Sequence, residues 1–250
     1  MSKGPVKPQA GGGSSPVDQG PIGLMIGIVF GTMLSALFAW AIAVIIEIVG
    51  MHTPMMWEAK GINHARGLIE EDLAYISEYP RSLIIPDTLG FSQSVAKMVA
   101  KPFLSMDVLG YYEESRRPIP DDLRDNMKRT SLLLKRELAK VFMVSMYIAM
   151  DTAVRMFVVV FALPAFALAC LLGAIDGLAR RDLRRWGGGR ESSFLYHRAK
   201  KATLWSLTVG FGLYLAWPFG GFNPAYMVLV FTALVAWSLS VWVSTFKKYI

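Results

Sequence analysis

Three long stretches without a charged residue constrain this sequence more than any other feature. They cover residues 19–46, 156–175 and 202–246, which are 28, 20 and 45 residues long. A helix of about 20 apolar residues crosses the roughly 30 Å hydrocarbon core of a bilayer. The first two stretches therefore predict one membrane span each. The third is long enough for two, with a Pro- and Gly-rich turn at residues 217–224 between them.

The expected fold class is an all-α membrane protein with four transmembrane helices, near residues 22–46, 156–175, 202–217 and 225–246. The hydrophobic fraction of 54% is above that of ordinary soluble domains. A soluble helical protein is the alternative, but a core helix rarely runs twenty residues without a charge on any face. The first stretch follows a polar tail and is too long for a cleaved signal peptide, so we expect an uncleaved anchor.

Charge in the connecting segments predicts the orientation. Residues 176–201 carry eight Lys and Arg against three Asp and Glu, a net charge of 8 − 3 = +5. Short loops this basic stay on the cytoplasmic side. Both termini are then cytoplasmic, and residues 47–140 lie on the other side. Five cations between Lys128 and Lys140 fit this orientation poorly, but long segments are translocated largely regardless of charge.

The chain divides into four predicted parts. Residues 1–20 form a disordered cytoplasmic tail, because Gly, Pro and Ser dominate them. Residues 21–46 are the first transmembrane helix, and residues 47–140 are a helical segment between the first and second spans. Residues 141–250 are a three-helix transmembrane region with the basic cytoplasmic loop 176–201.

Helical periodicity dominates the 47–140 segment. Apolar residues recur at three- and four-residue steps from Ile62 to Ile76, and Tyr79-Pro80 ends that helix. A second helix is expected near residues 91–98. Asp121 and Asp122 are typical of a helix start, and nothing breaks the pattern from residue 123 to residue 161. The second span is thus expected to be part of one long helix that projects from the membrane.

Small residues occupy every fourth position of the first span. In lipid, such a ridge lets another helix approach closely, and this close packing drives association. The ridge packs either against the other spans of this chain or against another membrane subunit. Its members are Gly23, Gly27, Gly31, Ser35, Ala39 and Ala43.

Asp151 and Arg155 lie four residues apart on one helix face, acid first, which favours an ion pair. Charges inside a bilayer are costly and often mark ion pathways. With residues 156–175 as the span, however, the pair lies at the membrane boundary. A boundary ion pair is therefore preferred to a transport role.

The basic loop carries adjacent arginines at the end of the second span. Topology and contact with anionic lipids account for such a cluster. Docking onto an acidic surface of a cytoplasmic partner is the alternative. Its glycines follow a helix rather than a strand and lack a phosphate-binding pattern, so nucleotide binding is not supported. The arginines are Arg180, Arg181, Arg184, Arg185 and Arg190.

No catalytic, metal-binding or cofactor-binding residues are predicted. The three histidines, His52, His64 and His197, lack metal-ligand spacing, and the sequence shows no recognisable arrangement of a nucleophile with a general base. We therefore expect a protein that is not an enzyme.

The run Asp-Gly-Leu at residues 176–178, with Arg-Arg-Asp-Leu-Arg-Arg-Trp-Gly-Gly-Gly-Arg-Glu-Ser-Ser-Phe-Leu-Tyr-His-Arg-Ala-Lys at residues 180–200, resembles the signature of integrating conjugative element membrane proteins. These belong to mobile elements of proteobacteria and are encoded beside the coupling ATPase of a conjugative type IV secretion system. The resemblance implies a multi-pass protein of the bacterial inner membrane, with residues 47–140 in the periplasm. It carries over no site residue.

Three hypotheses follow. The first is an inner-membrane adaptor for the coupling ATPase or other secretion-system membrane subunits, as a single copy or as an oligomer. The second is a small channel or transporter that uses Asp151 and Arg155, with Asp176 as a further acid. The third, direct DNA binding, is not expected, because the cytoplasmic flank accounts for most of the +7 net charge.

Overall fold

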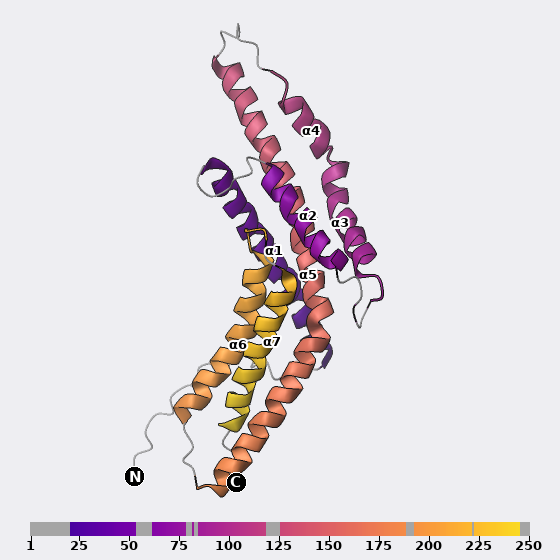
Figure 1. Ribbon diagram of the computed structural model, residues 1–250. Helices are drawn as coiled ribbons and strands as arrows, with labels where there is room; N and C mark the ends of the chain where they lie inside the picture. Colours follow the sequence, from indigo (N-terminus) through magenta and orange to yellow (C-terminus); the bar gives the residue numbers. More distant parts are fainter. Residues whose placement is uncertain are drawn as a thin grey trace, which may run out of the picture. The chain divides into compact units, whose positions relative to one another are not determined.

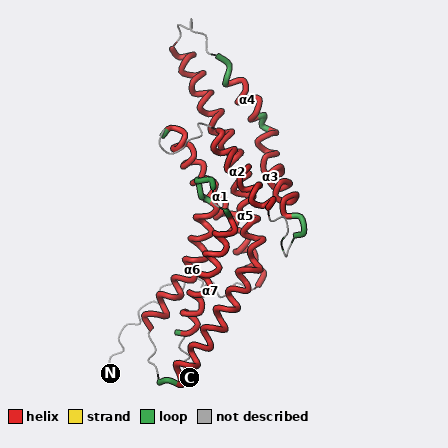
Figure 2. The backbone as a smooth tube through the Cα atoms, viewed as in Figure 1, coloured by secondary structure: helices red, strands yellow, loops and turns green. Residues whose placement is uncertain are grey.

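The computed structural model describes residues 21–53, 62–78, 82, 85–118, 126–188, 193–221 and 223–245; for residues 21–29, 193–196, 204 and 207–209 it describes the backbone alone. The predicted tail, residues 1–20, lies outside the described residues. Within the described ranges the regular secondary structure is helical throughout (Figure 2). The helices are α1 Pro21–His52, α2 Ile62–Glu78, α3 Thr88–Ser105, α4 Val108–Ser115, α5 Asn126–Trp186, α6 Ser193–Leu215 and α7 Pro224–Ser244.

Three of these helices are long and apolar enough to cross a membrane. They are the Phe30–His52 part of α1, then α5, and α7. This finding indicates a membrane protein and matches three of the four predicted spans. The remaining predicted span, residues 202–217, coincides with α6. In the described part of the chain, α6 is not among the helices of membrane-spanning length and apolarity. The count of four therefore stays a prediction.

The chain forms two compact units, Met1–Ser35 and Ala36–Ile250. In the first unit the structure describes the beginning of α1. The second unit holds the rest of α1 and the six other helices. All tertiary contacts given below belong to this second unit.

Helix α5 organises the second unit. It runs for 61 residues, about 90 Å at the standard helical rise, and passes the predicted domain boundary at residue 140 without a break. The predicted long helix that contains the second span is thus confirmed. Pro164 lies within it, and the helix continues beyond Pro164 to Trp186, where Gly187 and Gly188 form a turn.

Helices α2, α3 and α4 pack along the first half of α5 (Figure 1). The apolar face of α2, with Ala65 and Leu68, meets Val144 and Ile148 of α5. This is the face that the three- and four-residue periodicity predicts, so the α2 prediction is confirmed. The 47–140 segment therefore buries its apolar residues against a helix that continues into the second span.

Two features of this segment differ from expectation. Helix α3 is longer than the predicted 91–98, because Asp87 caps its first turn by accepting a hydrogen bond from the Gly90 amide. Helix α4 was not predicted. It starts at Asp107, which adopts a left-handed conformation with φ of 51° and accepts a hydrogen bond from the Gly110 amide.

Helices α6 and α7 pack beside the second half of α5 (Figure 1). Ala162 and Phe166 of α5 meet Val235 of α7, and Phe211 of α6 packs against the same cluster. Asn223 caps α7, accepting a hydrogen bond from the Ala225 amide, directly before Pro224 in the first turn. The predicted turn between the last two apolar segments thus lies where the sequence places it.

Candidate functional site

Arg155 forms a buried ion-pair cluster in the middle of α5. Its Nε lies 3.0 Å from Oδ2 of Asp151, the partner that the four-residue spacing predicts. The same Nε lies 2.6 Å from Oδ2 of Asp72 on α2. The side chains of all three residues are at least nine-tenths buried. One guanidinium is therefore shared by two carboxylates from two helices.

Asp72 was missed by the sequence analysis, although a signal was present. It follows Leu68 by four residues and precedes Ile76 by four, so it lies on the apolar face of α2. An acid on such a face needs a buried partner, because an unpaired carboxylate in a core is costly. Arg155 supplies that partner.

Arg155 also holds the connection between α6 and α7. Its Nη1 donates hydrogen bonds to the carbonyl oxygens of Tyr214, at 3.5 Å, and of Trp217. Next to it, the Gly221 amide donates to Oε2 of Glu71 on α2 over 2.7 Å. Gly221 has a φ of 76°, a conformation that glycine adopts without strain. Arg155 and Glu71 together join α2, α5 and the α6–α7 connection.

This geometry fits a structural role better than an ion pathway. We refer to Arg155 with Asp72 and Asp151 as the clamp, because it joins α2, α5 and the α6–α7 connection. The Arg155 guanidinium contacts two carboxylates and two backbone carbonyls, so its position is fixed from three sides. Within the described part of the chain, Oδ1 of Asp151 and the hydroxyl of Tyr214 are buried without a hydrogen-bond partner. The Tyr214 side chain is buried, with its ring 6.0 Å from the Arg155 guanidinium carbon.

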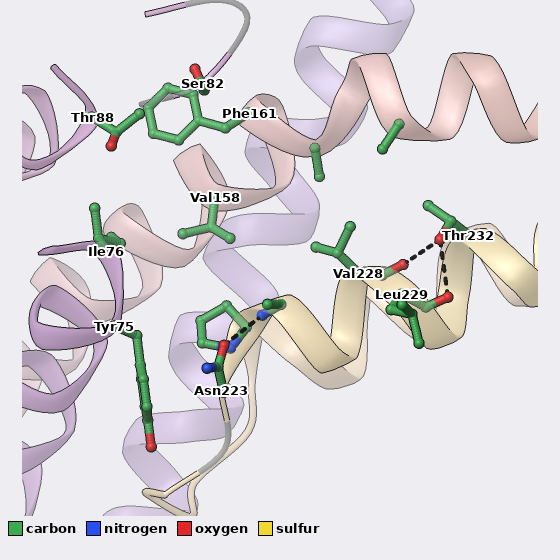
Figure 3. Close-up of a pocket in the computed structure, with 14 residues that line it drawn as sticks. Tyr75, Ile76, Ser82, Thr88, Val158, Phe161, Asn223, Val228, Leu229 and Thr232 are labelled. Atoms are coloured by element: carbon green, nitrogen blue, oxygen red, sulfur yellow. Dashed lines mark hydrogen bonds between the residues drawn. The ribbon is translucent and has the colours of Figure 1, made fainter. Parts of the chain in front are cut away.

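A groove of about 450 Å³ is lined by residues of α2, α5 and α7 and of the segments that precede α3 and α7 (Figure 3). Val158 and Phe161 of α5, Val228 and Leu229 of α7, and Ile76 of α2 form apolar walls. The described lining residues include hydroxyls and one amide but no carboxylate, imidazole, thiol or amine. The described lining therefore offers no carboxylic acid or histidine for general acid–base chemistry. The polar members of the lining are Tyr75, Ser82, Thr88, Asn223 and Thr232.

The small-residue ridge of α1 is partly used within the chain. Ala39 and Ala43 are buried, and Ala43 belongs to the cluster in which α2 and α5 meet. Beside them, Nε1 of Trp40 donates to the Ser145 carbonyl over 3.1 Å. One turn further, Glu47 is fully buried against His64 of α2, with Oε1 and Nδ1 2.9 Å apart.

The other ridge residues belong to the first unit. Ser35 and Gly31 lie in its described part, and a Cβ at Gly31 would meet no atom of that unit within 4 Å. The structure describes the helical backbone at Gly23 and Gly27 but not their side-chain surroundings. Of the four ridge residues whose surroundings the structure describes, Ala39 and Ala43 thus pack within the chain, and Gly31 and Ser35 belong to the first unit.

A second ridge of this kind, missed by the sequence analysis, joins α5 to α7. Cβ atoms at Gly173 and Gly177 would lie 2.5 and 2.6 Å from the backbone oxygens of Ala236 and Ser240. The signal was a Gly-x-x-x-Gly pattern that begins near the end of the second span, at Gly173, and permits this close approach. The Ser240 hydroxyl also donates a hydrogen bond to Asp176. Asp176 therefore packs against α7.

The arginines of the predicted basic loop differ in what they contact. Arg180 pairs with Asp176 at 2.8 Å, and Arg184 donates a hydrogen bond to the Ser244 carbonyl at the end of α7. Arg181 lies 3.8 Å from Asp182. Arg185 is exposed, and the structure gives it no ion pair or hydrogen bond with a described residue. Arg190 lies outside the described residues.

Comparison with known proteins identifies one family. A family model for an IncC plasmid conjugative DNA transfer protein, DtrJ-like, matches residues 56–247, which is more than half of the chain and leaves α1 outside. Comparisons with curated proteins and with solved structures give no match. The conjugative nature of the family agrees with the resemblance of the 176–200 run. The narrower assignment to integrating conjugative elements stays a prediction.

Proposed function

Because the chain belongs to the DtrJ-like family of conjugative DNA transfer proteins, we propose that it is a non-enzymatic inner-membrane subunit of a type IV secretion system. In this role it is an adaptor that holds the coupling ATPase, or other membrane subunits of the system, in place. The family match carries the proposal. The three membrane-length helices support it, because an adaptor for a membrane machine must lie in the bilayer.

The proposed topology has four spans and both ends in the cytoplasm. Helix α6 supplies the additional span with its uncharged part, which begins at Ala202 directly after the last cations of the basic loop, Lys200 and Lys201. Helices α2, α3 and α4, with the first half of α5, are then periplasmic. The α6–α7 connection lies on the same side, which agrees with the hydrogen bond between Gly221 and Glu71 of α2.

The proposed contact with other membrane subunits lies on the N-terminal part of the α1 ridge. Ala39 and Ala43 are already buried against this chain's own helices, so they are unsuited to a partner. Gly23, Gly27, Gly31 and Ser35 are the ridge residues left for it. These lie outside the range matched by the family, so this contact is proposed for this chain and not for the family.

Co-purification in mild detergent tests the adaptor. The tagged chain should recover the coupling ATPase of the same element, and Gly27→Leu with Gly31→Leu should reduce that recovery about tenfold, because bulky side chains prevent close helix approach. The matched control is Ile28→Leu with Thr32→Leu, on the same helix turns but off the ridge. Unchanged recovery in the ridge variant would exclude the ridge as the contact.

A channel or transporter is the second candidate, favoured by the burial of Asp151 and Arg155 in the middle of a membrane-length helix. If this is the function, Asp151→Asn alone should abolish DNA transfer while the protein remains folded. If the clamp is structural, Asp151→Asn should retain transfer, because Asp72 still pairs with Arg155. DNA transfer frequency and the amount of protein in the membrane, measured together, separate the two functions.

Direct nucleic-acid binding is not part of the proposal. The cations of the basic loop are accounted for by orientation and by contact with anionic lipids, each cation contributing about 1 kcal/mol near such a surface. Salt-sensitive retention of DNA by the purified protein would contradict this view.

A further inference from the structure

The clamp contains two acidic side chains and one basic side chain. With Asp72, Asp151 and Arg155 all ionised, its net charge is 1 − 2 = −1. The three side chains are only 9%, 3% and 4% exposed, so water does little to offset the surplus charge. Burying an uncompensated carboxylate is costly, and such a group usually takes up a proton instead.

In the described part of the chain, no second cation faces the clamp. The charged groups that act on Asp151 are Arg155 and Asp72. Helix α6 adds the uncharged phenol of Tyr214, and the only ionisable residue of α7, Tyr226, is exposed. His64 of α2 is engaged by Glu47 of α1. The other charged side chains of α2 and α3 are exposed; they are Arg66, Glu70, Glu71, Glu78, Lys97 and Lys101.

The two carboxyl groups of the clamp lie against each other. Oδ2 of Asp72 and Oδ2 of Asp151 lie 2.6 and 3.0 Å from the same Nε of Arg155. The Asp151 carboxyl is also hydrogen-bonded to the Asp72 carboxyl. Two ionised carboxylates are both acceptors, so no hydrogen lies between them. This contact therefore requires a proton on one of the two groups.

Asp151 is the more suitable carrier of that proton. The Nε–H of Arg155 donates its hydrogen bond to Asp72, whereas Oδ1 of Asp151 is buried without a hydrogen-bond partner among the described residues. A carboxylate needs donors around both oxygens, but a protonated carboxyl group is itself a donor. With the proton on Asp151, Asp72 keeps the negative charge that pairs with Arg155.

We propose that the clamp is a proton-binding site, in which the Asp151 carboxyl holds one proton at neutral pH and donates it in a hydrogen bond to Asp72. The bound proton makes the buried cluster neutral. Its loss would leave one carboxylate uncompensated where α2, α5 and the α6–α7 connection meet, so this joint weakens as the pH rises. The inference goes beyond the proposed adaptor function and does not depend on it.

Infrared spectroscopy of the full chain in detergent detects the proton directly, because the C=O stretching band of a protonated carboxyl group is separate from the bands of carboxylates. We expect this band in the wild type at neutral pH. Labelling the aspartate carboxyl carbons with carbon-13 should shift it, and Asp151→Asn should remove it. The matched control is Glu47→Gln, which replaces another fully buried acid and should leave the band unchanged.

Three spectroscopic results would overturn the proposal. The first is a wild-type spectrum without the band, which a bound metal cation or an ordered water in place of the proton would give. The second is a band that aspartate labelling does not shift, because it would belong to a glutamic acid. The third is a band that persists in Asp151→Asn. If that variant does not fold, the wild-type band and its carbon-13 shift still decide the question.

The pH dependence of stability gives a second readout. Aspartates of the unfolded chain release their protons near pH 4, whereas the folded clamp retains one, so unfolding above that pH releases a proton. Relative to Asp151→Asn, the unfolding equilibrium constant of the wild type should rise about tenfold per pH unit between about pH 5 and 7. The histidines titrate in both proteins and cancel in this comparison. An equal pH dependence in the two proteins would contradict the bound proton.

Discussion

Arg155 is the residue on which the packing of the second unit depends most. It neutralises one of two buried carboxylates, Asp72 and Asp151, and it satisfies carbonyls at the α6–α7 connection. Each of these groups loses its partner if Arg155 is removed. The sequence spacing predicted the contact with Asp151, which is local. The contact with Asp72, 83 residues away, required the tertiary structure.

We predict that Arg155→Met strongly destabilises the protein. Removing one partner of a buried ion pair typically costs about 3–5 kcal/mol, because an uncompensated charge remains buried. The triple variant Arg155→Met, Asp72→Asn, Asp151→Asn should regain much of this loss, since no unpaired charge is left. Thermal unfolding in detergent measures both. Equal midpoints for the wild type and Arg155→Met would show that the clamp contributes nothing.

At the scale of elements, helix α7 approaches the backbone of α5 closely at two glycines. The backbone oxygens of Ala236 and Ser240 occupy the space where side chains would stand at Gly173 and Gly177. Such an approach is favourable in lipid, where apolar side chains gain little from meeting each other. It explains why glycines occupy two positions in the interior of a long helix.

We predict that Gly177→Ala weakens this pair. The new methyl group would lie 2.6 Å from a backbone oxygen, and overpacking of this kind costs about 1–3 kcal/mol. Gly212→Ala on α6 is the matched control, because a Cβ there meets nothing within 4 Å and alanine favours helix. Protease resistance and thermal unfolding in the same detergent compare them. Equal loss in both variants would contradict the close approach.

For the whole molecule, the unbroken α5 unites parts that the sequence analysis divided. Helices α2–α4 pack on its first half, and α6 and α7 pack on its second half. Apolar burial and the Arg155 clamp thus couple the 47–140 segment to the membrane-length helices. In the proposed topology, this coupling joins a periplasmic surface and the cytoplasmic end of α5 through one continuous helix.

We predict opposite locations for two reporters on this chain. After Ile250, only the reporter that requires the cytoplasm should be active. After Pro118, only the reporter that requires the periplasm should be active. Paired alkaline phosphatase and green fluorescent protein fusions measure this. Periplasmic activity at Ile250 would contradict the proposed orientation.

The sequence by itself determined the helical class, the approximate positions of the helices other than α4, and the Asp151–Arg155 contact. These depend on composition, periodicity and spacing within one helix, all of which are local. Only the tertiary structure decided that Asp72 completes the clamp, that Ala39 and Ala43 of the α1 ridge are used internally, and that Gly173 and Gly177 seat α7. Such contacts join residues far apart in the chain. The sequence around a small or charged residue is the same whether or not another helix packs against it, so the local pattern cannot reveal the contact.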